Sequence, residues 1–183
     1  MLSINLMQAL DPVLFAREAL GFLPDPWQEK VLRWSGKGLL LNCSRQSGKS
    51  TTAASLALHR AKFFPSSLVL LISPSQRQSS ELFRKVQEFL KSLPADQQPK
   101  LIEDNKLSLT LRNKSRIVSL PGKEGTIRGF SGADLIIEDE AARVPDELYI
   151  AVRPMLAVSG GRIILMSTPF GKRGHFFKEW TEG

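Results

Sequence analysis

Apolar residues along this chain are spaced in two different ways. Four short runs are almost unbroken and lead into small or polar residues, which is typical of strands buried on both faces of a parallel sheet. Elsewhere the apolar positions recur every three or four residues, which is typical of helices that bury one face. Asp11 suits the N-cap of the first helix and Gly21 suits its end. The expected strands span residues 38–42, 68–73, 134–140 and 162–167. The expected helices span residues 11–20, 27–34, 51–58, 76–93 and 145–156.

The middle of the chain carries a different strand pattern. Residues 107–111 and 116–120 alternate apolar and polar positions around a short polar turn, which predicts a β-hairpin. The Gly-rich segment 121–132 is expected to be a loop. Because the remaining strands alternate with helices, they imply parallel βαβ units. The predicted fold is therefore α/β, with a mostly parallel central sheet flanked by helices in three layers, plus a β-hairpin insertion.

The composition fits one globular domain. The chain has 183 residues, 42% of them hydrophobic and 23% charged, which is enough to build a core. We expect no membrane association, because no apolar run approaches the roughly 20 residues of a membrane span. A single cysteine excludes an internal disulfide and fits a reducing cytoplasm. The net charge of +7 suits a polyanionic partner, but it is weak evidence alone, since many basic proteins bind no nucleic acid.

Polar clusters follow three of the predicted strands, at residues 43–50, 138–140 and 167–168. The carboxyl ends of parallel strands meet at one edge of a sheet, so we expect these clusters to converge. The first cluster ends in Gly-Lys-Ser and opens a helix, which is the context of a phosphate-binding P-loop. We therefore expect a P-loop NTPase in a single domain over residues 1–183, with N-terminal helices over 1–36 and a nucleotide-binding core over 37–183.

Each P-loop side chain has a chemical role in this prediction. Lys49 can reach the β and γ phosphates of ATP, and the Ser50 hydroxyl can ligate Mg²⁺. Cys43 stands where the first glycine of the usual pattern lies. Arg45 either touches the γ-phosphate from the same subunit or braces the turn. The residues expected to bind the nucleotide in this loop are Ser44, Arg45, Gln46, Ser47, Gly48, Lys49, Ser50 and Thr51.

The second cluster is acidic and fits a Walker B strand. Asp139 is expected to hold Mg²⁺, and Glu140 is expected to orient and deprotonate the attacking water. Glu138 leaves the register open, because Glu138-Asp139 also forms an acidic pair. The alternative without function is a solvated acidic strand end. Phosphoryl transfer needs no covalent intermediate, so these few groups suffice for ATP hydrolysis.

Two further polar residues are candidates at the same edge. Gln28 precedes the P-loop strand, and its amide can both donate to and accept from an adenine edge; the alternative is an ordinary surface glutamine. Thr168 follows a core strand, where we expect it to reach the γ-phosphate and to sense hydrolysis; the alternative is a strand cap. His59 and His175 have no partners at ligand spacing, so metal binding through them is not expected.

An ordered set of motifs resembles the ATPase domain of the phage terminase large subunit. The set comprises Pro26-Trp27-Gln28, Ser44 to Ser50, Thr126-Ile127-Arg128-Gly129, Asp139-Glu140-Ala141-Ala142 and Ser167-Thr168-Pro169. By resemblance, Gln28 belongs to the adenine motif, Asp139 and Glu140 to Walker B, and Thr168 to the coupling motif. The resemblance also makes Arg128 the candidate for an arginine finger supplied to the neighbouring subunit, with Arg45 acting in cis. Contact with DNA phosphates is the alternative for Arg128.

The resemblance implies an ATP-driven motor that uses ATP and Mg²⁺ to thread viral DNA into a preformed capsid. The implied partners are double-stranded DNA, the portal protein and the terminase small subunit. A homo-oligomeric ring is implied for the assembled motor, and a monomer for the domain in isolation. The implied location is the cytoplasm of the bacterial host, at the procapsid portal.

Two features of the sequence bear on rival interpretations. Terminase large subunits also carry a C-terminal nuclease, but this chain has no acidic cluster after Thr168, so we expect an ATPase domain or prophage fragment that does not cleave DNA. A glutamine motif with Asp-Glu and Ser-Thr-Pro also resembles the first domain of superfamily 2 helicases, which need a second motor domain. A nucleotide-binding scaffold without turnover is a further alternative, against which Lys49, Asp139 and Glu140 argue.

Overall fold

The computed structural model describes residues 2–121, 127 and 129–182, with side chains from residue 4 onward. The helices are α1 (Leu2–Leu10), α2 (Pro12–Leu14), α3 (Pro26–Leu32), α4 (Lys49–Phe63), α5 (Gln76–Ser92), α6 (Asp146–Ser159) and α7 (Gly174–Glu182). A π-helical segment spans Phe15–Ala19, and a 3-10 turn spans Ala141–Arg143. The strands are β1 (Gly38–Asn42), β2 (Leu68–Ser73), β3 (Leu101–Asp104), β4 (Ser108–Leu111), β5 (Arg116–Pro121), β6 (Leu135–Asp139) and β7 (Arg162–Ser167).

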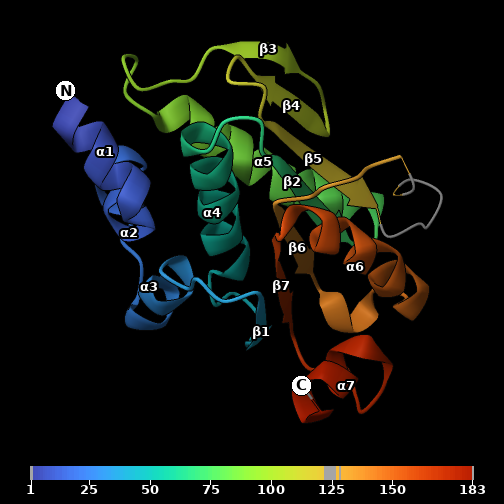
Figure 1. Ribbon diagram of the computed structural model, residues 1–183. Helices are drawn as coiled ribbons and strands as arrows, with labels where there is room; N and C mark the ends of the chain where they lie inside the picture. Colours follow the sequence, from blue (N-terminus) through green and yellow to red (C-terminus); the bar gives the residue numbers. More distant parts are fainter. Residues whose placement is uncertain (1, 122–126, 128, 183) are drawn as a thin grey trace.

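All seven described strands belong to one sheet, in the order β1-β7-β6-β2-β5-β4-β3 (Figure 1). The first five in that order run parallel, and β5, β4 and β3 pair antiparallel. This confirms the predicted mostly parallel sheet. The predicted hairpin is β4–β5, and it is continuous with the main sheet because β5 pairs with β2 along its whole length.

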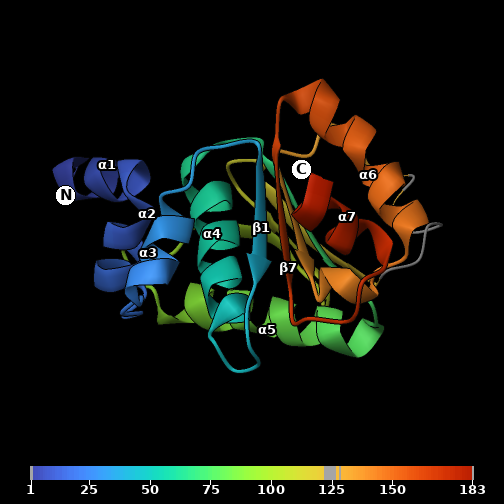
Figure 2. The same ribbon diagram turned by 90° about the horizontal axis from the view of Figure 1, so that it is seen from below.

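The sheet is covered on both faces, as its unbroken apolar strands require. Alternate residues of β2 point to opposite sides: Val69 and Leu71 join the core beneath α4 and α5, whereas Leu70 and Ile72 join the core beneath α6. Figure 2 shows α4 and α5 on one side of the strands and α6 and α7 on the other. The result is the predicted three-layer arrangement of helix, sheet and helix.

The N-terminal helices pack onto the α4 side of the sheet. Asp11 caps α2 as expected, because its carboxylate accepts a hydrogen bond from the Val13 amide at 2.9 Å. The predicted helix over 11–20 continues from α2 into the π-helical segment, and Gly21 follows it with a left-handed φ of 63°. Phe15 is fully buried in the same hydrophobic cluster as the α4 side chains. These helices therefore share the hydrophobic core on the α4 side of the central sheet.

Three elements were not predicted from the sequence. The edge strand β3 has all four residues exposed, so it carries no burial pattern to detect. Helix α1 ends in a mainly exposed apolar stretch, and α7 buries only His175 and Phe176. Such short, weakly buried elements depend on tertiary contacts more than on periodicity. In the described part of the chain, each helix is too short or too polar to cross a membrane.

Candidate functional site

The carboxyl ends of β1, β7 and β6 meet at one edge of the sheet. Asn42 at the end of β1 lies opposite Ser167 in β7, and Asp139 at the end of β6 lies opposite Met166. The Cys43 amide extends this pairing by donating to the Ser167 carbonyl at 3.0 Å. The register therefore brings the three polar clusters together at this edge.

The loop between β1 and α4 turns sharply before the helix begins at Lys49. Gly48 has a φ of 84°, in the left-handed region that favours glycine. A Cβ atom there would also lie only 2.4 Å from the Gln28 side-chain nitrogen. The Lys49 side chain is 7% exposed, and its ammonium donates to the Ser44 carbonyl at 3.1 Å. The lysine thus folds over the loop at the amino end of α4, where the helix dipole favours an anion.

Ser50 and Asp139 face each other across the site. The Ser50 hydroxyl donates to the Asp139 carboxylate at 3.3 Å. Burial, together with the neighbouring Glu140 charge, raises the pKa of Asp139 to about 6, although Lys49 and Ser50 act in the opposite direction. A buried carboxylate beside a hydroxyl supplies the hard oxygen ligands that Mg²⁺ prefers. These residues fit a magnesium ion.

Glu140 occupies a strained position directly after β6. Its φ of 55° is uncommon for a residue with a side chain. One carboxylate oxygen accepts hydrogen bonds from Arg143 at 2.6 Å and from the Thr168 hydroxyl at 3.0 Å. The carboxylate is therefore held between the 3-10 turn and the end of β7.

Arg143 is a site residue that the sequence analysis missed. Its guanidinium lies 2.6 Å from Glu140 and 3.1 Å from the Thr168 hydroxyl, and it stacks over the Phe170 ring at 4.2 Å. The signal available in the sequence was its position three residues after Glu140, which becomes a contact only because Ala141–Arg143 forms a helical turn.

These groups line one cavity of about 380 Å³. The lining residues are Arg45, Gln46, Lys49, Ser50, Gln78, Asp139, Glu140, Arg143 and Thr168. Arg45 is exposed, and Lys49 and Asp139 are the most deeply buried charged groups among them. The cavity thus combines a buried ammonium, a hydroxyl and two carboxylates, which are groups that can bind phosphate, bind a metal ion and accept a proton from water.

Glu138 lies outside this cavity. It is fully buried and accepts a hydrogen bond from the His175 ring at 2.9 Å. His175 also contacts Asp146 at 3.3 Å and stacks on Tyr149. Burial lowers the pKa of His175, but hydrogen bonds to the two carboxylates and their charges outweigh it, so the pKa is raised. The fold thus gives His175 the acidic partners that its sequence spacing did not reveal.

The remaining predicted residues lie around the loop. The Gln28 side chain is buried, accepts from the Asp25 amide at 2.7 Å and donates to the Ser47 carbonyl at 3.4 Å. Gln28 therefore braces the P-loop from α3. Thr51 lies one residue beyond Ser50 in α4 and accepts from Lys85 at 3.4 Å, outside the cavity lining. Arg128 lies outside the described residues.

Comparison with known protein sequences gives matches across most of the chain. The sequence profile of the family described as "Terminase large subunit, T4likevirus-type, N-terminal" matches residues 40–183. A terminase large subunit from Thermus virus P23-45 is 31% identical in an alignment of 173 residues, which covers 84% of this chain and 35% of that protein. The chain thus spans about a third of that relative's length.

Solved structures with the same fold include two from phages. The large terminase ATPase domain of Thermus phage P74-26 superimposes with a TM-score of 0.74 at 25% identity, over 91% of this chain and 72% of that one. The large terminase of a thermophilic bacteriophage, solved in complex with ADP, gives a TM-score of 0.61 at 15% identity, over 96% and 41% of the two chains.

Proposed function

The chain belongs to the terminase large subunit family, and from this premise we propose that it is an ATPase motor domain. It hydrolyses ATP with Mg²⁺ to drive translocation of double-stranded DNA into a procapsid. The observation that carries the proposal is the single cavity in which Lys49, Asp139 and Glu140 meet. These three groups supply phosphate binding, metal binding and water activation.

Each group has a defined task in the proposed hydrolysis. Lys49 and the first amides of α4 bind the β and γ phosphates. Ser50 and Asp139 would hold Mg²⁺, which would neutralise the charge of the phosphates when it is bound. Glu140 orients the attacking water and accepts its proton.

Thr168 and Arg143 are proposed to couple this chemistry to the fold. Both hydrogen-bond to the Glu140 carboxylate, and Thr168 follows the end of β7 directly. A change in the Glu140 contacts on hydrolysis is therefore transmitted to β7 and to the 3-10 turn. Arg45 is exposed at the mouth of the cavity and is assigned to the γ-phosphate in cis.

The nucleotide and the wider assembly follow from the family. The large terminase of the thermophilic bacteriophage, which shares the fold, is described in complex with ADP, and this supports a nucleotide in the present cavity. Gln28 is assigned to the adenine side of the site, next to the loop that it braces. The proposed partners are double-stranded DNA, the portal protein and the terminase small subunit, in a homo-oligomeric ring in the host cytoplasm.

The test is ATP binding by the Lys49→Ala protein. Removing the ammonium deletes a charge-assisted phosphate contact of roughly 1.5–3 kcal/mol, so the affinity for ATP should fall about 10- to 100-fold in calorimetric titration. Lys91→Ala is a matched control, because Lys91 is an exposed lysine near the end of α5. Chelating Mg²⁺ should also weaken binding. Unchanged affinity in Lys49→Ala would remove the basis of the proposed site.

A further inference from the structure

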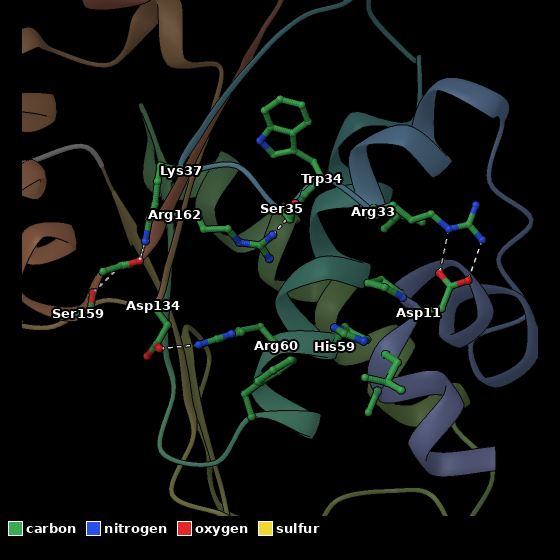
Figure 3. A pocket seen from close by; sticks show the side chains of 17 residues that line it. Asp11, Arg33, Trp34, Ser35, Lys37, His59, Arg60, Asp134, Ser159 and Arg162 are labelled. Atoms are coloured by element: carbon green, nitrogen blue, oxygen red, sulfur yellow. Dashed lines mark hydrogen bonds and ion pairs between the residues drawn. The ribbon is translucent and has the colours of Figure 1, made fainter. Parts of the chain in front are cut away.

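A second and larger cavity, of about 690 Å³, lies at the opposite edge of the sheet from the proposed ATP site. It is lined by the N-terminal helices, the last turn of α4 and the segments that lead into β1, β6 and β7 (Figure 3). It shares no lining residue with the ATP cavity. Because the strands between them are five or six residues long, the two cavities are separated by about 15–20 Å.

The charges in this cavity do not balance. Its lining holds four basic side chains and two carboxylates, namely Arg33, Lys37, Arg60, Arg162, Asp11 and Asp134. Arg33 pairs with Asp11 and Arg60 with Asp134, each at 2.7 Å. Among the described residues, Lys37 and Arg162 pair with no carboxylate. Two positive charges therefore remain without a counter-charge.

In the described part of the chain, the hydrogen-bond partners of Lys37 and Arg162 are neutral carbonyl groups. Lys37 donates to the Gly160 carbonyl, and Arg162 donates to the Trp34 carbonyl. A carbonyl satisfies a donor but does not neutralise the charge behind it. Burial, followed by the nearby Arg60 charge, lowers the pKa of Arg162. An anion bound beside Arg162 would offset the cost of holding its charge in this position.

The arrangement of the cations favours an oxyanion with several acceptors. Figure 3 shows the Arg60 and Arg162 side chains in the space between the starts of the strands and the Arg33–Asp11 pair. Lys37 lies beside Arg162. The Nε atom of Arg60 is buried without a hydrogen-bond partner in the described structure. Guanidinium groups present fixed N–H forks that match the geometry of phosphate oxygens. Within the described structure, the cluster therefore offers positive charges without carboxylate partners and an N–H donor without an acceptor.

The cavity also has an apolar side. Trp34 and Phe64 line it and remain 44% and 39% exposed. The Arg60 guanidinium lies over the Phe64 ring, 4.3 Å from its centre. The partly exposed Trp34 ring beside the cationic cluster suits a ligand that carries a flat part next to its phosphate, because bases stack on aromatic side chains. His59 lines the same cavity with its pKa lowered to about 4, so it adds an uncharged aromatic wall at neutral pH.

We propose that this cavity is a second anion-binding site, which takes a phosphate group on Arg162, Lys37 and Arg60. The phosphate belongs either to a free phosphate compound or to the backbone of a nucleic acid. The site is separate from the proposed ATP site, and its occupancy does not depend on hydrolysis.

The test uses the tryptophan indole N–H signals in NMR spectra of the isotope-labelled chain. The chain has three tryptophans, of which Trp34 lines the cavity and Trp180 lies on α7, outside its lining. The probe is pyrophosphate, titrated at constant ionic strength with NaCl as the compensating salt, in the Lys49→Ala background. We expect a saturable shift of the Trp34 signal and none of the Trp180 signal.

Three substitutions locate the binding. Arg162→Gln and, separately, Lys37→Gln should each weaken pyrophosphate binding about tenfold, the worth of one charged hydrogen bond. The matched control Arg112→Gln, on the exposed turn of the hairpin, should leave it unchanged. Lys37 is exposed, so Lys37→Gln keeps the test valid if Arg162→Gln does not fold.

A short DNA duplex then separates the two sources of phosphate. Displacement of pyrophosphate by the duplex supports a nucleic-acid backbone as the natural occupant, and retention of pyrophosphate supports a free phosphate compound. The proposal is overturned if NaCl alone produces the Trp34 shift, if the shift does not saturate, or if it survives both Arg162→Gln and Lys37→Gln.

Discussion

Glu138, Asp139 and Glu140 are consecutive carboxylates with three different surroundings. Glu138 is fully buried against His175, Asp139 faces Ser50 with its pKa raised to about 6, and Glu140 is held by Arg143 and Thr168. Strand alternation turns the first two to opposite sides, and the left-handed backbone at Glu140 turns the third into the cavity. The roles proposed for these residues follow from the side of the strand to which each side chain points.

Arg143 provides a test of the contacts that hold Glu140. Arg143→Gln removes the charged partner of the Glu140 carboxylate and loosens it relative to the phosphates. We expect kcat for ATP hydrolysis to fall about tenfold or more, because a misplaced base loses much of its contribution. The affinity for ATP should stay within a few-fold, since the proposed phosphate ligands Lys49 and Ser50 are untouched.

A structural role for Arg143 would give a different pattern. If Arg143 instead positions Glu140, Arg143→Lys should recover part of kcat without altering KM, because lysine keeps the charge although it lacks the planar guanidinium group. Arg153→Gln is the matched control, because Arg153 is exposed on α6 and lies outside the ATP cavity. An equal loss of kcat and of ATP affinity in Arg143→Gln, with no recovery by lysine, would contradict a positioning role.

At the scale of elements, the parallel strands and their polar ends were predictable, because apolar runs such as 68–73 have little alternative to burial. The convergence of residues 43–50, 138–140 and 167–168 followed from the rule for parallel sheets. The features that the sequence does not reveal depend on tertiary contacts. The turn that brings Arg143 to Glu140, the pairing of His175 with Glu138 and the exposed strand β3 leave no periodic signal.

The docking of α1 onto α4 depends on a buried histidine. His59 donates from its ring to the Gln8 carbonyl at 2.9 Å and packs among Phe15, Phe63 and Phe64. Burial lowers the pKa of His59 to about 4, although the Gln8 carbonyl acts in the opposite direction, and the charges of Arg162 and Arg60 lower it further. The folded chain therefore resists protonation of this ring.

The lowered pKa of His59 makes the folded chain less stable as the pH falls. The unfolded chain takes up the His59 proton near pH 6.5 and the folded chain only near pH 4. The contribution of neutral His59 to the free energy of unfolding is therefore fully present above about pH 6.5. It is lost as the pH falls toward 4, which lowers the free energy of unfolding by about 3 kcal/mol. Denaturant unfolding at several pH values, in buffers without phosphate, measures the loss.

His59→Gln isolates this contribution. Glutamine does not titrate and can still donate to Gln8, so the difference in unfolding free energy between the two proteins should change between pH 6.5 and 4. His175, whose raised pKa has the opposite sign, is present in both proteins and cancels. Stability curves that stay parallel over this range would exclude His59 as the titrating group.

At the scale of the whole molecule, the sheet separates two charged cavities. The proposed ATP site lies at the carboxyl ends of the strands, and the proposed phosphate site lies at their amino ends. We also propose, from the family resemblance, a third site between subunits, for which Arg128 is the candidate. Arg128 lies in a Gly-flanked segment eleven residues before Asp139, and a trans arginine stabilises the transition state by roughly 10³–10⁵-fold.

A trans role for Arg128 predicts complementation. Specific ATPase activity should rise with protein concentration, and neither Arg128→Ala nor Glu140→Gln should be active alone. Mixed together, the two proteins should recover activity, because some interfaces then combine an intact Glu140 with an intact Arg128. Failure of both effects in a sample that demonstrably forms rings would assign Arg128 to another role, such as contact with DNA phosphates.

The most direct test of the central claim compares two neighbouring glutamates in one ATP hydrolysis assay. Glu140→Gln should bind ATP with Mg²⁺ as the wild-type chain does, while hydrolysis falls about 10²-fold or more. Glu138→Gln, which alters a carboxylate outside the cavity, should still hydrolyse ATP within a few-fold of the wild-type rate. Hydrolysis at the wild-type rate by Glu140→Gln, with loss in Glu138→Gln, would contradict the account and place the catalytic base elsewhere.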